Sequence, residues 1–357
     1  MSTGKPHKSR KANFPAVSGE VTKLINALRV KGTRSVCFFN NKGGVGKTTL
    51  VANLAAQLSL VWGLKILVVD ADPQCNLTQY VLSDEDFIET YRDSDAIKSI
   101  FSVIHPLSIG KGYSATLPVR KIPSFGFDVV IGDPRLALKE DLLAQDWRDA
   151  KSGGTRGLRT TFVFSDLIKK ATNYDIVFFD MGPSLGAINR SVLLAANHFV
   201  VPMSIDIFSI WAIKNIGDAL KIWQRDLDNG LKLAEDPSEL PKVTTGSRPS
   251  FLGYVTQQHK ERLEKDGTRI VEAYNAISKT IPEQVKQNLN HLSIKNSDPH
   301  LGDIKHLASL APKSQTLHTP MITVTLKGSY TGLRKQARTL YQNIGTHFLK
   351  NLVAGAR

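Results

Sequence analysis

The chain has few cysteines, no long apolar run and fewer acidic than basic residues. Its 357 residues include two cysteines, Cys37 and Cys75, which excludes a framework of several disulfide bonds. No apolar stretch approaches the roughly 20 residues that span a bilayer. Residues 1–30 also lack the apolar run of a signal peptide. We therefore expect a cytoplasmic protein without a transmembrane segment.

The charge balance indicates a polyanionic partner. The chain has 46 basic and 32 acidic residues, which gives a formal net charge of +14. Neutralising the phosphates of a nucleic acid releases counterions whatever the base sequence, so a basic protein gains affinity for it. Nucleic acid is the first candidate, and an anionic membrane is the alternative that charge alone leaves open.

Length and composition favour one large domain with insertions. Hydrophobic residues make up 41% of the chain and charged residues 22%, as in ordinary globular proteins. Residues 1–34 are predicted to form a basic tail and a short helix, and residues 351–357 a C-terminal tail. The domain between them, residues 35–350, is expected to carry surface insertions near residues 81–125 and 225–250.

A glycine-rich turn lies between a predicted strand and a predicted helix. Apolar residues 36–39 precede the turn, and a helical pattern over residues 50–58 follows it. The turn consists of Lys42, Gly43, Gly44, Val45, Gly46, Lys47, Thr48 and Thr49. Its glycines let backbone N–H groups point at an anion, and the helix adds its positive dipole end. Lys47 is placed to reach the β- and γ-phosphates of a nucleotide, and the Thr48 hydroxyl to complete the shell of a Mg²⁺ ion.

Lysines at both ends of this turn are typical of one group of P-loop proteins. The usual P-loop has glycine at position 41, where this chain has Asn41, and does not specify Lys42. The turn closely resembles the deviant Walker A motif of the ParA/MinD family of dimeric ATPases. The resemblance implies an α/β, doubly wound P-loop fold with a mostly parallel sheet and helices on both faces. It also implies ATP and Mg²⁺ as ligands and an ATP-dependent homodimer, in which Lys42 reaches the phosphates of the partner subunit.

Two more strands end in carboxylates. A buried strand over residues 64–70 leads to Asp72, in a run that resembles the switch I of this family. By that resemblance Asp72 orients or deprotonates the attacking water and helps to hold the Mg²⁺ shell, while Asp70 either supports the loop or only caps the strand. A strand ending at Asp180 fits a Walker B element, whose carboxylate reaches the Mg²⁺ region through water. Gly182 stands where the family's switch II more often has proline, which predicts a softer loop.

Further elements follow from apolar periodicity. We expect strands over residues 127–133 and 251–256 and helices over residues 136–147 and 205–220. Residues 193–203 are expected to form a helix and then a buried strand that ends at Pro202, with His198 at the junction. Residues 151–159 are expected to form a mobile basic loop, which either contacts a phosphate or only links its neighbours. Residues 257–262 depart from the family's adenine-contacting pattern, so no adenine contact is assigned to them. His198 is expected at the surface.

The last helix combines an apolar stripe with a basic face. The apolar side chains at helical spacing are Leu333, Ala337, Leu340, Tyr341, Ile344 and Phe348. Arg334, Lys335 and Arg338 cluster on another face, with Lys327 just before the helix. The resemblance makes these three the candidate contacts for DNA without sequence preference. An ordinary solvated face and a membrane-targeting helix remain the alternatives.

These features together predict an ATPase switch of the ParA type. The ATP dimer would bind DNA non-specifically, and so associate with the nucleoid, until a ParB-like or other stimulating partner triggers hydrolysis. A MinD-like ATPase that binds membranes is one alternative. Another is an ATP-gated accessory subunit of a nucleic-acid-processing or defence complex.

Overall fold

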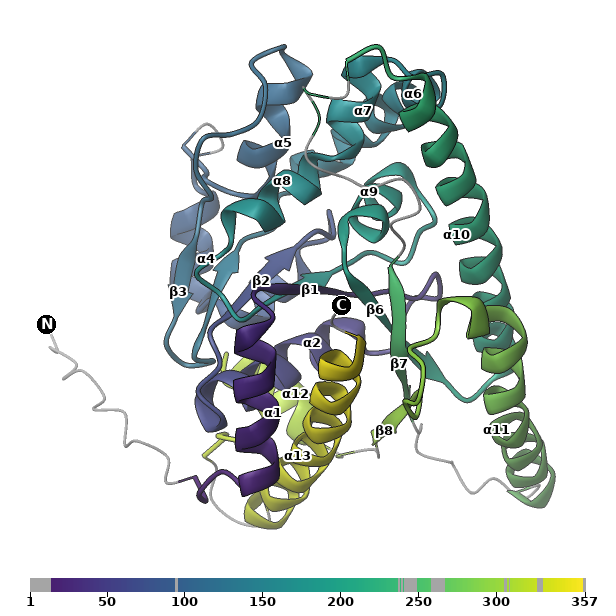
Figure 1. The fold of residues 1–357 in the computed structure, drawn as a ribbon. Helices are drawn as coiled ribbons and strands as arrows, with labels where there is room; N and C mark the ends of the chain where they lie inside the picture. The colour runs from purple at the N-terminus through teal and green to yellow at the C-terminus, as the bar shows by residue number, and fades with distance from the viewer. Residues whose placement is uncertain are drawn as a thin grey trace, which may run out of the picture.

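A single mixed sheet organises the chain (Figure 1). The computed structural model describes residues 14–93, 96–236, 238, 240, 249–257, 267–304, 307, 309–325 and 330–355. The strands are β1 (Arg34–Phe38), β2 (Ile66–Asp70), β3 (Arg120–Ile122), β4 (Phe127–Val130), β5 (Ile176–Asp180), β6 (His198–Ser204), β7 (Ser250–Gln257) and β8 (His300–Ile304). Their order is β3-β4-β2-β5-β1-β6-β7-β8. The β3–β4 pair is antiparallel and the other neighbouring pairs are parallel, which confirms the predicted fold class.

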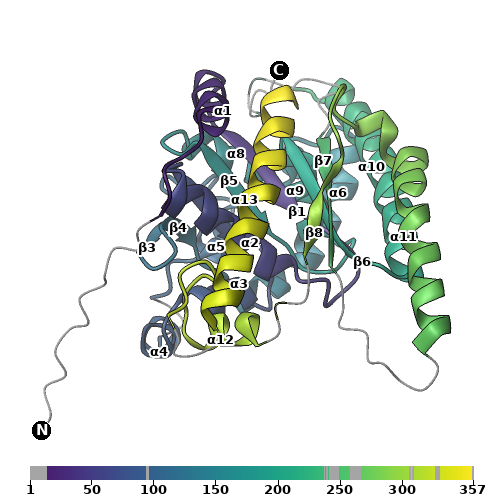
Figure 2. The ribbon, with the colours of Figure 1, turned by 90° about the horizontal axis from the view of Figure 1, so that it is seen from below.

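Helices cover both faces of this sheet (Figures 1 and 2). One face carries α1 (Gly19–Val30), α2 (Lys47–Ala56) and α13 (Tyr330–Gly355). The other face carries α5 (Ile100–Ser108), α8 (Val163–Lys170), α9 (Ala187–Ala195), α10 (Ile207–Leu233) and α11 (Gly267–Leu289). The remaining elements are η1 (Gln57–Val61), α3 (Asn76–Val81), α4 (Asp84–Tyr91), η2 (Pro134–Lys139), α6 (Glu140–Lys151), α7 (Thr155–Thr161), η4 (Asn290–Leu292) and α12 (Leu310–Thr316). Strands such as β2 and β5 are buried along their whole length, because a parallel sheet between two helical layers exposes neither face.

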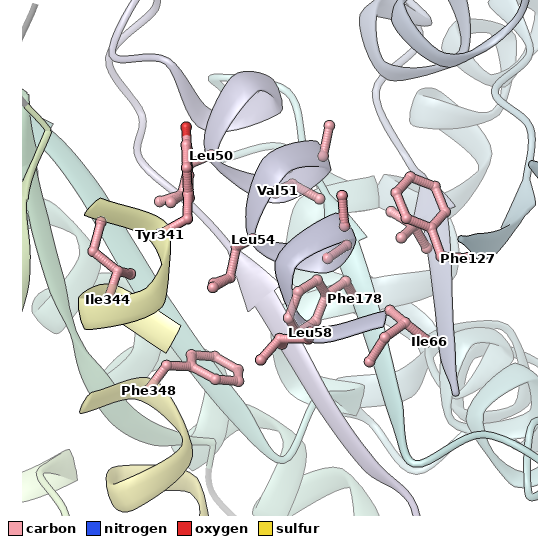
Figure 3. Packing of buried hydrophobic residues seen from close by; sticks show 14 of the residues in the cluster. Leu50, Val51, Leu54, Leu58, Ile66, Phe127, Phe178, Tyr341, Ile344 and Phe348 are labelled. Carbon is pink, nitrogen blue, oxygen red and sulfur yellow. The ribbon is translucent and has the colours of Figure 1, made fainter. Parts of the chain in front are cut away.

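The helix after the glycine turn is packed between the sheet and the last helix (Figure 3). From α2 the figure shows Leu50 and Leu54 turned towards Tyr341 and Ile344 of α13. All four side chains are 1% exposed or less. The predicted apolar stripe of the last helix is therefore core, and it fixes the start of α2 relative to the strands.

The structure corrects four expectations about chain organisation. Of the predicted tail over residues 351–357, residues 351–355 belong to α13, and Leu352 extends the buried stripe of this helix. The predicted surface excursion over residues 225–250 begins as the last turns of α10, and residues 241–248 lie outside the described part of the chain. The basic loop at residues 151–159 mostly belongs to α6 and α7. His198 is 3% exposed in β6, so its expected surface position is wrong.

The segment expected to be a surface insertion, residues 81–125, is partly core. Its helix α5 buries Ile100, Val103 and Ile104 against the second helical layer, whereas α4 buries no residue. The segment closes with β3, an antiparallel edge strand that the sequence analysis did not predict. The two cysteines are buried and form no disulfide bond.

Candidate nucleotide-binding site

The three predicted motifs meet at the carboxyl ends of neighbouring strands. In the strand register, Phe38 at the end of β1 lies opposite Asp180 at the end of β5, and Asp70 at the end of β2 lies on the other side of Asp180. The glycine turn follows β1, and the Asp72 loop follows β2. Ligands of open α/β sheets bind at this edge, so the topology assembles one site from segments far apart in sequence.

The turn has the backbone conformation that its glycines predict. Gly44 and Gly46 have φ angles of 75° and 68°, in the left-handed region that strains other residues. A Cβ atom on Gly46 would also lie 1.8 Å from Nε2 of Gln257, so a larger residue there would have to move this flexible side chain. Gln257, the last residue of β7, therefore packs directly on the turn. The sequence analysis gave Gln257 no role. Its position directly after the predicted strand over residues 251–256 could have indicated that it lies near the site.

Lys47 lies inside the turn with its charge directed at the backbone. Its ammonium donates to the carbonyl oxygens of Asn40 and Lys42, at 3.1 Å each, and the residue is 8% exposed. Burial lowers the pKa of Lys47, while the nearby charges of Asp180 and Asp72 act in the opposite direction. A buried cation at the end of a glycine-rich turn, next to the start of a helix, suits the binding of a polyphosphate.

Asp180 is a buried carboxylate close to the charges of Lys47 and Asp70. It is 1% exposed, and neither carboxylate oxygen accepts a hydrogen bond of ordinary geometry from the residues that the structure describes. Burial raises the pKa of Asp180 to about 8, with the charge of Asp70 as the next cause, and the Thr48 hydroxyl acts against both. An orphaned buried carboxylate is costly unless a cation approaches it.

Asp70 has a different environment and a different role. Its carboxylate accepts hydrogen bonds from the backbone N–H of Thr78, at 2.9 Å, and from the Thr78 hydroxyl, at 2.6 Å. Burial raises its pKa to about 7, and these hydrogen bonds oppose the rise. Asp70 therefore anchors the start of α3 to the end of β2, as the loop-supporting alternative expected.

Asp72 faces the second switch-like loop. It is 7% exposed and accepts a hydrogen bond from the backbone N–H of Gln74 at 2.9 Å. A Cβ atom on Gly182 would lie 3.1 Å from the Asp72 carboxylate. A larger residue at position 182 would therefore have to shift this carboxylate slightly. Glycine at position 182 thus lets the backbone of this loop approach Asp72.

A cavity of about 720 Å³ opens in front of the turn. Its walls include Thr48 from α2, Asp72, and Pro183 from the loop after β5. The cavity is also lined by residues without a predicted role, namely Gln79, Tyr80, Gln315, Thr316 and His318. The Tyr80 hydroxyl links α3 to α2 and α12, because it contacts Asn53 and Ser314 at 3.0 and 2.5 Å.

The donor set fits Mg²⁺ held together with a phosphate. Among the residues that the structure describes, no group of three or more His, Cys, Asp and Glu side chains is arranged to bind a metal alone. Mg²⁺ usually keeps several waters and uses one or two protein ligands plus substrate phosphates. Thr48 and Asp72 both line the cavity, and both act on the pKa of the buried Asp180 carboxylate, so the residues present suit such an ion.

Lys42 lies at the rim and pairs within its own subunit. Its ammonium donates to the carboxylate of Asp206, the residue before α10, and lies 6.0 Å from the centre of the Phe208 ring. Burial opposes ionisation of Asp206, but hydrogen bonds from Lys42 and from the Ser209 backbone outweigh it and lower the pKa of Asp206. The sequence analysis did not identify Asp206 as the partner of Lys42.

The candidate DNA contacts lie apart from this site, on α13. Two of them are engaged with the chain itself: Arg334 donates to the Val324 carbonyl at 3.2 Å, and Arg338 to the Ile322 carbonyl at 2.8 Å. Lys335 is exposed, and Lys327 lies outside the described residues. Of the helices in the described part of the chain, none combines the length and apolarity that crossing a bilayer requires.

Comparisons with known proteins agree with this geometry. A family model described as an AAA domain matches residues 33–233. A virulence plasmid ParA family protein of Chlamydia psittaci is 29% identical, over 55% of this chain and 66% of that protein. The chromosome-partitioning ATPase Soj of Treponema pallidum is 26% identical, over 56% of this chain and 68% of that protein. For three of the curated relatives, the chain spans between 52% and 66% of the relative's length.

Solved structures extend the similarity beyond the matched domain. A crystal structure of a Corynebacterium diphtheriae protein has a TM-score of 0.66 and 30% identity, covering 80% of this chain and 97% of the other. A Cyanothece McdA variant in complex with ATP shares the fold, with a TM-score of 0.55 at 15% identity over 88% of this chain and 97% of the other. With its doubly wound sheet and double-lysine turn, the chain belongs to the ParA-type family of P-loop ATPases.

Proposed function

We propose that the chain hydrolyses ATP as a dimerising switch and binds DNA in its ATP-bound form. The observation that carries the proposal is the arrangement around the turn, where Lys47 is buried between inward-facing backbone groups and the carboxylates of Asp72 and Asp180. The ATPase Soj and the plasmid ParA protein, both similar in sequence, support a role in DNA partition.

Each residue has a distinct task in this proposal. Lys47 and the turn amides stabilise the charge that develops on the γ-phosphate, and Asp72 positions the water that attacks in line with the leaving group. Thr48, Asp72 and Asp180 would hold Mg²⁺, which when bound would neutralise charge on the phosphates. Lys42 leaves Asp206 and completes the site of the partner subunit.

The net charge of +14 supports DNA binding. Lys335 is the exposed member of the candidate set, while Arg334 and Arg338 already hold carbonyl groups of the preceding loop. A ParB-like partner would stimulate hydrolysis and release the dimer from the nucleoid. The membrane-binding and accessory-subunit alternatives share the nucleotide chemistry and differ in the surface that the dimer engages.

The test is DNA binding by Asp72→Ala protein, which should retain ATP without hydrolysing it. We expect ATP, but not ADP, to support DNA affinity that falls steeply as salt rises from about 50 to 200 mM. ATP-dependent dimers that ignore DNA at every salt concentration would contradict the DNA-binding proposal. If such dimers instead sediment with anionic liposomes, the membrane-binding alternative replaces it.

A further inference from the structure

A second cavity, of about 570 Å³, lies between α5, the turn after it, and α7. The two helices are at the end of the molecule that is uppermost in Figure 1. The described residues that line the cavity share no member with those that line the cavity in front of the glycine turn. They are Leu107, Ser108, Ile109, Gly110, Gly112, Thr155, Arg156, Arg159 and Thr160.

The charged side chains of this cavity are basic. Arg156 and Arg159 line it from α7, and no carboxylate is among its lining residues in the described part of the chain. A third cation reaches the wall, because the Lys139 ammonium donates to the Ser108 hydroxyl at 3.1 Å. Arg156 is paired with Asp146 at 3.5 Å, but the arginine side chain remains 69% exposed. The cavity therefore carries a surplus of positive charge.

The turn after α5 positions the Arg159 side chain. Gly112 has a φ angle of 79°, and a Cβ atom there would lie 3.3 Å from Nη2 of Arg159. The Arg159 guanidinium lies 6.0 Å from the centre of the Tyr113 ring, and the Tyr113 hydroxyl donates to the Arg159 carbonyl at 2.7 Å. A guanidinium that the fold already holds loses little freedom when it binds an anion.

The carbonyl groups at the end of α5 are already hydrogen-bonded. The N–H groups of residues 109–111 donate to the carbonyls of Pro106 and Leu107 at 2.9 to 3.3 Å. The Ser108 hydroxyl donates to the His105 carbonyl at 2.7 Å. The three basic side chains are therefore not required to satisfy the end of this helix, and their charge is directed at the cavity.

We propose that this cavity binds a small phosphate ester. A guanidinium matches two phosphate oxygens with parallel hydrogen bonds, and an ammonium adds a point charge. The volume is that of a small-molecule site and exceeds what a phosphate ion alone occupies, so the ligand has an organic part. Leu107 and Ile109 offer apolar contact to that part. Of residues 151–159, for which the sequence left a phosphate contact open, Arg156 and Arg159 make that contact.

Titration calorimetry with phenyl phosphate tests this inference in Lys47→Ala protein, which lacks the ammonium of the nucleotide site. We expect saturable binding at a single site. Arg159→Gln should weaken it about tenfold or more, because a charged hydrogen-bond donor is lost. Arg156→Gln should weaken it as well, and the exposure of this side chain makes damage to the fold small. Thermal unfolding of each variant verifies that it is folded.

Arg225→Gln is the matched control. Its side chain is 68% exposed on α10 and is not among the residues that line the cavity, so this substitution removes one positive charge without touching the site. Phenyl phosphate should bind this variant as tightly as it binds the parent protein. An equal loss of affinity in the control and in both cavity variants would show that only net charge is sensed, and would overturn the inference.

Three other results would also overturn it. The first is binding that does not saturate, or that neither cavity variant weakens. The second is benzoate binding as tightly as phenyl phosphate, which would make the site one for carboxylates. The third is displacement of phenyl phosphate by duplex DNA, which would assign the cavity to the DNA backbone. ATP binding by the protein with Lys47 intact is measured separately, so failure of this inference leaves the proposed function standing, and the reverse.

Discussion

Removing the charge of Asp206 should make the ATP dimer form more readily. Lys42 pairs with Asp206 inside its own subunit, and it must leave that carboxylate to reach a partner's phosphates. The two side chains are 31% and 30% exposed, so solvent screens the pair and its worth is about 1 kcal/mol at most. Releasing one lysine should therefore tighten dimerisation by up to about fivefold for each subunit.

The choice of substitution separates this effect from damage to α10. The Asp206 carboxylate also accepts the Ser209 backbone N–H at 3.0 Å, as the N-cap of α10. Asp206→Asn keeps a good N-cap and removes the charge, whereas Asp206→Ala removes both and should cost about 1 kcal/mol of folding stability.

The assay is sedimentation velocity of both variants across a protein concentration series with ATP, in the Asp72→Ala background, alongside thermal unfolding. We expect a lower dimer dissociation constant for Asp206→Asn with only the small fall in Tm that loss of the ion pair causes, and a larger fall in Tm for Asp206→Ala, which also loses the N-cap. An Asp206→Asn protein that dimerises as before, or more weakly, would refute the reasoning that Asp206 restrains Lys42.

Three further predictions concern the site and the core. Lys47→Ala should abolish ATP binding, whereas Asp72→Ala should bind ATP and lose hydrolysis; calorimetry that finds equal loss of binding in both would contradict the assigned roles. The pKa of His198 is lowered from 6.5 to about 4 by burial, so below pH 6.5 the unfolded chain takes up a proton that the folded chain excludes. As the pH is lowered from 6.5 to about 4, the free energy of unfolding should therefore fall by about 1.4 kcal/mol for each pH unit. His198→Leu should flatten that slope in denaturant titrations, and an identical slope would show that His198 is not its source. Tyr80→Phe removes a hydroxyl that contacts Asn53 and Ser314, and it should lower the free energy of unfolding by about 1 kcal/mol in the same titrations. An unchanged free energy of unfolding would show that these contacts do not stabilise the fold.

The resemblance of the double-lysine turn to the ParA/MinD family implied the fold, and local patterns located the segments at the centre of the site. Neighbouring residues are enough to interpret the strand-turn-helix pattern around Lys47 and the apolar strands that end at Asp70 and Asp180. The structure brings these segments together at one sheet edge. Buried parallel strands have long apolar runs, which composition alone distinguishes from surface segments.

Features that depend on tertiary packing could not be predicted in this way. The last turns of α10 look charged and loop-like, but Gly230 packs so closely on α6 that a Cβ atom would lie 2.0 Å from the Ala150 carbonyl oxygen. The Lys42–Asp206 pair joins residues 164 positions apart, and Gln257 meets Gly46 only because β7 ends beside the turn. His198 is polar, but packing under the end of α13 buries it.

The central claim is that each active site takes Lys42 from the other subunit. Mixing two inactive variants tests it: Lys42→Ala retains Lys47 and Asp72, and Asp72→Ala retains Lys42. Lys47 contacts the carbonyl of Lys42 rather than its side chain, so Lys42→Ala should still bind ATP.

In a mixed dimer, the Lys42→Ala subunit keeps its own Asp72 and receives Lys42 from its partner, which completes one of the two sites. Proteins mixed in equal amounts before ATP is added should therefore recover about one quarter of the wild-type ATPase rate, since half of the dimers are mixed and each has one complete site. A rate no higher than that of either variant alone, with mixed dimers verified by affinity tags, would contradict the account.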